Sequence, residues 1–148
     1  MLTSTAEKPV EILLVEDSFS DALLVEETFK EAKLKSRLRL LRDGEDVLAY
    51  LRKEGPYSKV IRPSLVLLDL NLPKKSGLHI LSEIKNDPDL KRIPVVILTS
   101  SEAPDDIFRS YDLHANTFVT KPLDLYEFLK VLQEIENYWL DVAKLTPT

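Results

Sequence analysis

Short apolar runs recur along the chain, and most of them end directly at polar or charged side chains. Strand-like runs cover residues 12–15, 36–41, 65–68, 95–98 and 117–120. Most of them are continuous rather than alternating in polarity, which is typical of strands buried on both faces of a parallel sheet. The pattern therefore predicts five short strands, most of them inside such a sheet.

Segments of helical periodicity separate these runs. The first carries an apolar stripe at Ala22, Val25, Phe29 and Ala32, with charged residues between. Further helices are expected over residues 44–54, 78–85 and 104–111, and from about Asp124 onwards. Strict alternation of strand and helix implies βαβ units, whose right-handed crossovers place helices on both faces of the sheet. We therefore expect a single-domain α/β fold, a doubly wound (βα)5 parallel sheet.

Composition narrows the classes of function. The chain has 148 residues, enough for one domain, and its 44% hydrophobic and 30% charged content is ordinary for a soluble protein. Its net charge of −5 disfavours nucleic-acid binding, which depends on Lys and Arg neutralising phosphates. Without cysteine there is no disulfide, thiolate metal site or cysteine nucleophile. No membrane-spanning stretch or signal peptide is evident, so we expect a cytoplasmic protein with no membrane partner.

Candidate chemistry lies where the predicted strands end. The side chains there are Glu16, Asp17, Asp69, Thr99 and Lys121. Because the carboxyl ends of parallel strands meet along one sheet edge, we expect these groups to face one another. Three carboxylates repel unless a cation offsets their charge, and Mg²⁺ favours carboxylate, carbonyl and water oxygens. The sequence predicts a Mg²⁺ site.

The expected metal ligands and reacting groups follow from this arrangement. Asp17 and Asp69 would bind Mg²⁺ directly, Glu16 through water, and the backbone carbonyl of Asn71 would complete the protein's share. Asp69 is then placed to accept a phosphoryl group as a nucleophile. Lys121 would neutralise phosphoryl oxygens and the Thr99 hydroxyl would hydrogen-bond one of them. Taken singly, each residue also has an ordinary explanation as a turn, cap or surface group, and only their combination is specific.

Together the segments 12–18, 67–73 with Gly77, 97–100 and 118–122 resemble the receiver domain of two-component response regulators. The resemblance covers about residues 10–132 and implies the flavodoxin-like strand order 2-1-3-4-5. On this basis we expect a flexible N-terminal segment at residues 1–9, a receiver domain at 10–143 and a C-terminal tail at 144–148.

The resemblance implies a stand-alone response regulator that accepts a phosphoryl group on Asp69 from a histidine kinase. Such a protein catalyses only its own phosphorylation and dephosphorylation, and signals by protein contact or phosphorelay. Segments 50–63, 70–75 and 110–116 resemble more closely the regulators of cyanobacterial and bacterial phytochrome kinases. The family also implies a cis peptide bond at Lys121–Pro122, and we expect Thr99 to move toward the phosphoryl group while Phe118 fills the vacated space.

Some positions depart from the family pattern. His114 replaces a common glycine, Ser76 stands where many receivers have Asp, and Phe118 replaces the usual tyrosine. The final helix has two apolar stripes, of which the first would face the core and the second would be covered by the C-terminal tail or by a second copy in a homodimer. The first contains Leu125, Phe128, Leu132, Ile135 and Trp139, and the second Val131, Tyr138 and Val142.

Two other functions remain open at this point. A degenerate receiver could bind partners without being phosphorylated, although the full set of reacting residues argues against it. A Mg²⁺-dependent phosphohydrolase could use Asp69 as its nucleophile. Haloacid dehalogenase-type enzymes place a second acid two residues after the nucleophile, where this chain has Asn71, and they need a substrate pocket for which it has little room.

Overall fold

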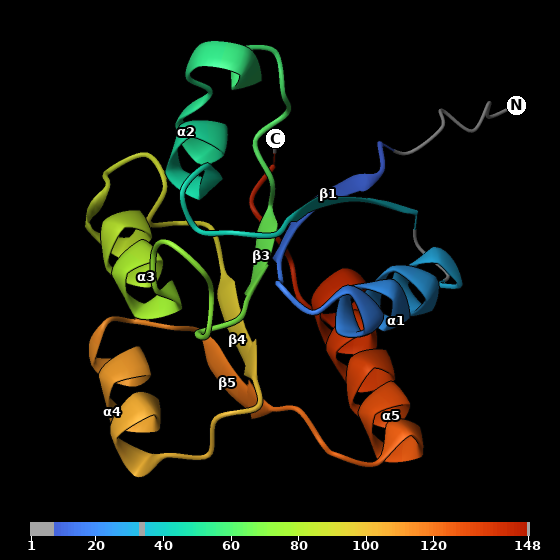
Figure 1. Ribbon diagram of the computed structural model, residues 1–148. Helices are drawn as coiled ribbons and strands as arrows, with labels where there is room; N and C mark the ends of the chain where they lie inside the picture. Colours follow the sequence, from blue (N-terminus) through green and yellow to red (C-terminus); the bar gives the residue numbers. More distant parts are fainter. Residues whose placement is uncertain (1–7, 33–34, 148) are drawn as a thin grey trace, which may run out of the picture.

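A computed structural model describes residues 8–32 and 35–147 as a parallel five-stranded sheet between two layers of helices (Figure 1). The strands are β1 (Val10–Val15), β2 (Ser36–Leu41), β3 (Leu65–Leu68), β4 (Val95–Thr99) and β5 (Thr117–Thr120). Their order is β2-β1-β3-β4-β5, which confirms the predicted topology. All four neighbouring pairs are parallel, as the crossover pattern requires.

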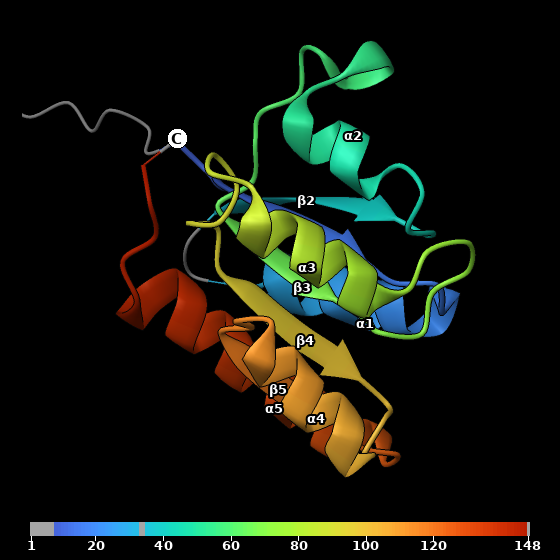
Figure 2. The ribbon, with the colours of Figure 1, turned by 90° about the vertical axis from the view of Figure 1, so that its left-hand side faces the viewer.

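Five α-helices cover the two faces of the sheet. They are α1 (Phe19–Lys30), α2 (Val47–Arg52), α3 (Gly77–Asn86), α4 (Pro104–Asp112) and α5 (Leu125–Glu136). Helices α1 and α5 pack together on one face, and α2, α3 and α4 cover the other (Figures 1 and 2). Among the described residues, no helix has the length and apolar character needed to cross a membrane.

The central strands are buried on both sides, as their continuous apolar runs predict. Along β1, Leu13 and Val15 pack toward α2 and α3, whereas Ile12 and Leu14 pack toward α1 and α5. Polar side chains then define where several helices begin: the side chains of Ser18, Ser76 and Asp124 accept hydrogen bonds from the first-turn N–H groups of α1, α3 and α5.

Helix α2 is shorter than the predicted segment 44–54. Gly44 lies in the preceding turn, where an added Cβ would clash with the Lys75 carbonyl oxygen. The helix ends at Arg52, and the next residue, Lys53, adopts a left-handed conformation with φ of 59°. The predicted surface loop after it contains one short 3-10 helix, η1 (Gly55–Tyr57). Backbone packing against the loop before α3 therefore sets the start of this helix.

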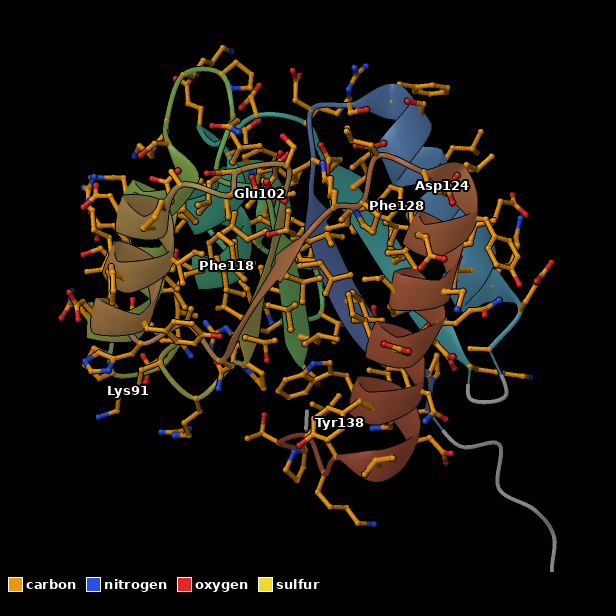
Figure 3. All side chains as sticks on the ribbon, turned by 90° about the horizontal axis from the view of Figure 1, so that it is seen from below. Lys91, Glu102, Phe118, Asp124, Phe128 and Tyr138 are labelled. Atoms are coloured by element: carbon orange, nitrogen blue, oxygen red, sulfur yellow. The ribbon has the colours of Figure 1, made fainter. Side chains whose placement is uncertain are left out.

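Helix α5 continues as a π-helical segment, η2 (Asn137–Val142). Phe128, Leu132 and Ile135 are buried as predicted, and Figure 3 shows Phe128 on the α5 side of the sheet and Phe118 on the α4 side. The prediction for Leu125 is wrong, since it is 57% exposed at the first turn. Leu140 is buried, because a π-helical turn contains an extra residue and shifts the apolar face.

The second apolar stripe is only partly covered. Val131 packs against the core, but Tyr138 and Val142 are 52% and 62% exposed. The described part of the C-terminal tail runs instead toward the beginning of β3, where the Ser64 hydroxyl donates to the Thr146 carbonyl oxygen at 3.5 Å. The tail therefore does not bury this stripe.

Two local features lie beside the edge strand β5: an unusual turn at His114 and a side-chain hydrogen bond to the strand's backbone. His114 has a left-handed backbone with φ of 70°, so the turn keeps a conformation suited to glycine despite the larger side chain. On the edge strand, the Phe118 N–H donates to the Tyr111 hydroxyl of α4 at 3.1 Å.

The Lys121–Pro122 bond is trans, the commoner isomer for X–Pro, contrary to the implied cis bond.

Candidate functional site

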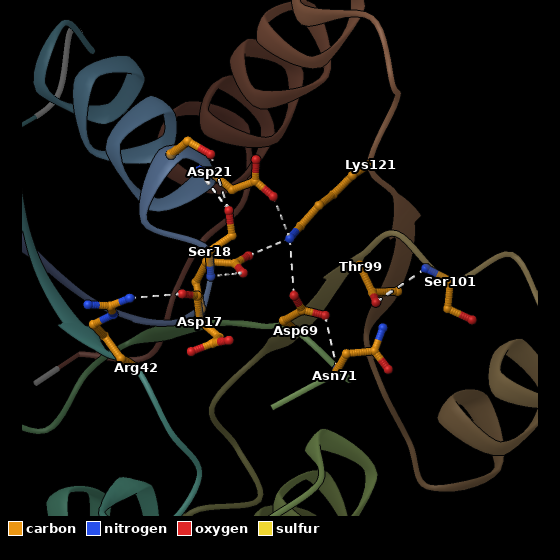
Figure 4. Close-up of polar contacts among 11 residues, drawn as sticks. Asp17, Ser18, Asp21, Arg42, Asp69, Asn71, Thr99, Ser101 and Lys121 are labelled. Atoms are coloured by element: carbon orange, nitrogen blue, oxygen red, sulfur yellow. Dashed lines mark hydrogen bonds and ion pairs between the residues drawn. The ribbon is translucent and has the colours of Figure 1, made fainter. Parts of the chain in front are cut away.

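The strand ends bring the predicted residues Glu16, Asp69 and Lys121 into direct contact (Figure 4). Glu16 follows β1, Asp69 follows β3 and Lys121 follows β5. The Lys121 Nζ lies 2.6 Å from Glu16 Oε2 and 3.0 Å from Asp69 Oδ2. All three side chains are buried, so these charge-assisted contacts are sheltered from water.

A third carboxylate, Asp21, completes the surroundings of Lys121 and was not predicted. Asp21 lies in the first turn of α1, and its Oδ2 is 2.9 Å from Lys121 Nζ. The sequence could have indicated it, because Asp21 follows Asp17 by one helical turn and lies in the first turn of the helix that Ser18 caps. Three carboxylates thus share one ammonium, which leaves a formal excess of two negative charges.

Asp17 occupies the outer part of the site. It is exposed, and its backbone carbonyl accepts a hydrogen bond from Arg42 Nη2 at 3.1 Å. Its carboxylate is not among the contacts of Lys121 and lies apart from that ammonium in Figure 4. This position suits a side chain that binds a metal ion arriving from solvent.

The donor set fits a hard divalent cation, since it consists of carboxylate and carbonyl oxygens with a surplus of negative charge. Asp69 is held from two sides, with Oδ2 toward Lys121 and Oδ1 accepting from the Asn71 N–H at 3.1 Å. In the described residues, no three acidic or histidine side chains are arranged as a ready metal cage. Lys121 takes the central position among the buried carboxylates.

Burial sets the protonation behaviour of the site. It raises the pKa of Glu16 to about 7, helped by the Asp69 charge and opposed by the hydrogen bond from Lys121. Burial alone would lower the pKa of Lys121, but the hydrogen bonds to Glu16 and Asp21 outweigh it and the pKa is raised. Lys121 therefore stays charged, and Glu16 can take up a proton near neutral pH.

Thr99 lies at the same edge but is turned toward the loop that leads into α4. It is fully buried, and its Oγ1 accepts from the Ser101 N–H at a long 3.4 Å. The Ser101 hydroxyl in turn donates to Asp106 Oδ2 at 2.6 Å. The Lys121 N–H donates to the Thr99 carbonyl at 2.7 Å, so the ends of β4 and β5 are fixed together.

The loop after Asp69 is shaped by a close approach of backbone to backbone. A Cβ at Gly77 would clash with the Asp69 carbonyl oxygen, so α3 can begin beside Asp69 only with glycine there. Lys74, with φ of 69°, turns the loop outward and pairs with Glu45 at 3.3 Å. The phosphoacceptor candidate therefore sits on a loop fixed at both ends.

This fold and site are those of a signalling module built around a buried Asp–Lys pair, and comparison with known proteins gives the family. The family model described as "Response regulator receiver domain" matches residues 12–133. The chain belongs to this family, whose members are signalling modules typically phosphorylated on aspartate.

Its relatives include the "Response regulator Rcp1" of Synechocystis sp., which is 47% identical over 144 residues, covering 97% of this chain and 98% of that protein. The structure of the phosphorylated cyanobacterial phytochrome response regulator RcpA is similar with a TM-score of 0.92 and 46% identity, over 95% of this chain and 100% of that one. The Mn²⁺-bound form of Rcp1 has a TM-score of 0.92 and 49% identity, over 94% and 100%. The chain is thus a response regulator related to those of phytochromes.

Proposed function

We propose that Asp69 is the phosphoacceptor of this chain and receives its phosphoryl group from a phosphohistidine of a phytochrome-type histidine kinase. One observation carries the proposal: the buried Lys121 ammonium lies 3.0 Å from the Asp69 carboxylate at the carboxyl edge of the sheet. The similarity to Rcp1 and RcpA supports the kinase type.

The reaction uses groups that are already in place. A carboxylate oxygen of Asp69 attacks phosphorus, an O–P bond forms and the N–P bond of the phosphohistidine breaks. The imidazole nitrogen keeps that electron pair and takes up a proton. Lys121 then moves its contact from the carboxylate, whose charge is lost when the O–P bond forms, to a phosphoryl oxygen, where it compensates part of the phosphoryl group's negative charge. No general base is needed, because Asp69 attacks as a carboxylate.

The same residues would hold Mg²⁺: Asp17 and Asp69 directly, Asn71 through its carbonyl and Glu16 through water. Mg²⁺ bound there supplies positive charge that stabilises the phosphoryl oxygens in the transition state. The surplus of carboxylates around Lys121 supports this assignment, as does the Mn²⁺-bound relative. The chain then acts as a phosphorylated switch, not as a turnover enzyme.

Thr99 and Phe118 transmit the change. Thr99 Oγ1 accepts from the Ser101 N–H at a long 3.4 Å, and its O–H can donate to a phosphoryl oxygen. Phe118 is only half-buried beside the core and can move into the space that Thr99 leaves. The surface of α4 and β5 then differs between the two states and binds a downstream protein or phosphotransfer partner in the cytoplasm.

A homodimer through the α5–η2 surface is part of the proposal. Tyr138 and Val142 remain exposed there, and Leu125 adds a further exposed apolar side chain on α5. Sedimentation velocity at tens of micromolar, before and after phosphorylation, tests this surface. A Tyr138→Ser/Val142→Ser variant should be monomeric, and a wild type that is monomeric in both states would reject the dimer.

The phosphoacceptor is tested by intact-protein mass spectrometry after incubation with acetyl phosphate, with and without Mg²⁺. Wild type and the control Asp105→Asn, which alters an exposed acid of α4, should gain one phosphoryl group in a Mg²⁺-dependent manner. Asp69→Asn should gain none. A folded wild type without an adduct would instead favour a receiver that only binds partners, and steady hydrolysis of small phosphate esters would favour a phosphohydrolase.

A further inference from the structure

An open cavity lies at the opposite end of the sheet from Lys121. It has a volume of about 430 Å³ and is lined by the segment after α2, the connection from α3 to β4 and the C-terminal tail. Figure 1 shows the tail ending beside the connection that leads from α2 into β3. Strands β3 and β4 begin here, so this cavity shares no residue with the phosphoacceptor site.

The charges around this cavity have one sign. Lys53, Lys59, Arg62 and Arg92 line it, against the single acid Asp89. Within the described parts of the chain, none of the four cations forms an ion pair, whereas the neighbouring Arg52 is paired with both Asp87 and Glu83. In a protein of net charge −5, an excess of three positive charges at one cavity, four cations against one acid, indicates an anionic ligand.

Arg62 is the best-fixed of these groups. It is half-buried, and its Nε donates to the Leu51 carbonyl oxygen at 2.9 Å, which anchors the plane of the guanidinium. Its terminal amino groups have no hydrogen-bond partner among the described residues. A fixed guanidinium with free donors matches the oxygens of a phosphate group, to which Arg binds in a bidentate manner.

The remaining walls are apolar. Val60, Ile61 and Ile93 line the cavity together with Pro63 and Pro147. Ile61 is 49% exposed, so this surface is not fully used by the protein's own packing. The volume falls within the range of about 300–1,000 Å³ that is usual for small-molecule sites.

We propose that this cavity binds an organic polyanion with at least two phosphate groups on an apolar body, as in a nucleoside diphosphate. A single phosphate of about −1.5 to −2 would leave part of the positive charge uncompensated, and an inorganic polyphosphate would leave the apolar wall without a partner. The ligand acts at a site separate from Asp69, so its binding does not require phosphorylation of the protein.

Isothermal titration of the full chain with ADP in EDTA tests the proposal, because removal of divalent cations prevents capture of a metal–nucleotide complex near Asp69. We expect a dissociation constant below about 1 mM and the same value for Asp69→Asn. Lys59→Gln/Arg92→Gln, which changes two exposed side chains, should bind about tenfold more weakly, since each charge-assisted contact contributes to affinity. Lys30→Gln/Lys130→Gln removes the same charge elsewhere and should bind like wild type.

Chemical-shift mapping locates the ligand. Changes on adding ADP are expected at residues 53–63, 89–93 and 146–147, and Arg62→Gln should weaken them while circular dichroism reports an intact fold. No binding at 1 mM ADP would overturn the proposal, as would an equal loss in the two charge-matched variants. Pyrophosphate binding as tight as ADP would overturn the role of the apolar wall. None of these outcomes affects the phosphorylation test at Asp69.

Discussion

At the residue scale, His114 adopts a backbone conformation that suits glycine better than a residue with a Cβ. Its φ of 70° belongs to the left-handed region, which costs a residue with a Cβ roughly 1–2 kcal/mol. We predict that His114→Gly raises the free energy of unfolding by about 1 kcal/mol, because part of this gain is offset by the greater freedom of glycine in the unfolded chain. Urea denaturation measures the change.

The control is His114→Ala, which removes the imidazole but keeps the Cβ. Its free energy of unfolding should not rise through relief of backbone strain, because alanine has a Cβ as well. A stabilisation equal to that of His114→Gly would show that the strain comes from the imidazole side chain instead. His114→Gly should also leave phosphorylation by acetyl phosphate unchanged, since the residue does not contact the site.

The contacts of individual site residues were predictable only in part. The Asp69–Lys121 contact follows from the rule that parallel strands end at one edge, and the sequence was enough to expect it. The role of Asp21 depends on the rotation of α1 about its axis, which packing against α5 sets. Thr99 lies at the expected edge of the sheet, but the contact of its Oγ1 with the Ser101 N–H depends on a side-chain rotamer that no sequence pattern encodes.

At the scale of elements, Asp106 links α4 to the end of β4. Its carboxylate accepts from the Ser101 hydroxyl, and its carbonyl accepts from the buried Ser110 hydroxyl at 2.7 Å. We predict that Asp106→Ala loosens the start of α4 and raises amide hydrogen exchange at residues 101–107 by several-fold, since one charge-assisted hydrogen bond is lost. Exchange monitored by mass spectrometry checks this.

Asp105 provides the matched control for Asp106. It directly precedes Asp106 in the same first turn, but it is exposed and pairs with Arg109 at 3.8 Å. Asp105→Ala should leave exchange in this loop near the wild-type level, as exposed pairs of this kind contribute little. Equal effects of both substitutions would show that helix-terminal charge, rather than the Ser101 contact, holds α4 in place.

Lys85 joins α3 to the segments that precede β4 and β5. Its ammonium donates to the Ile93 carbonyl at 2.8 Å, to Asn116 Oδ1 at 3.0 Å and to the Lys91 carbonyl at 3.2 Å. Burial lowers the pKa of Lys85 below its ordinary 10.5. Between the lowered pKa and 10.5 the unfolded chain binds more protons than the folded one, so unfolding free energy rises with pH in this window.

We therefore predict that wild type gains stability relative to Lys85→Gln as the pH is raised from 7.5 toward 10. Chemical denaturation at both pH values measures the difference between the two proteins, which cancels titrations that they share. Lys91→Gln, which removes an exposed lysine nearby, is the charge-matched comparison. A constant difference between wild type and Lys85→Gln across this range would contradict the prediction.

The elements themselves were largely predictable, because continuous apolar runs fix strands and polar caps fix helix starts. The 36–41, 65–68 and 117–120 strands agree with the structure residue for residue. The exceptions have identifiable physical causes. Gly44 lies close to a distant loop and delays the start of α2. In the π-helical segment after α5, Trp139 packs partly buried against the core as predicted, and Leu140 is buried as well. Long-range packing, which a single sequence does not display, decides both.

At the scale of the whole molecule, the surplus negative charge at one edge couples folding to metal binding. We predict that Mg²⁺ at a hundredfold excess over its dissociation constant raises the free energy of unfolding by about 2.7 kcal/mol. Asp17→Asn should remove most of this gain without loss of basal stability, because Asp17 is exposed. Thermal unfolding with Mg²⁺ and after EDTA treatment measures it, and Asp105→Asn should respond like wild type.

The sheet has two edges, and β5 is one of them. An edge strand offers unpaired N–H and C=O groups to any other extended chain, which is a route to aggregation. The Tyr111 hydroxyl occupies one of these donors, the Phe118 N–H, by reaching across from α4. If the proposed switch displaces α4, this hydrogen bond is lost, and the edge of β5 becomes open to pairing with another extended chain while the docking surface forms. In that case the phosphorylated form becomes more prone to aggregate the longer α4 stays displaced.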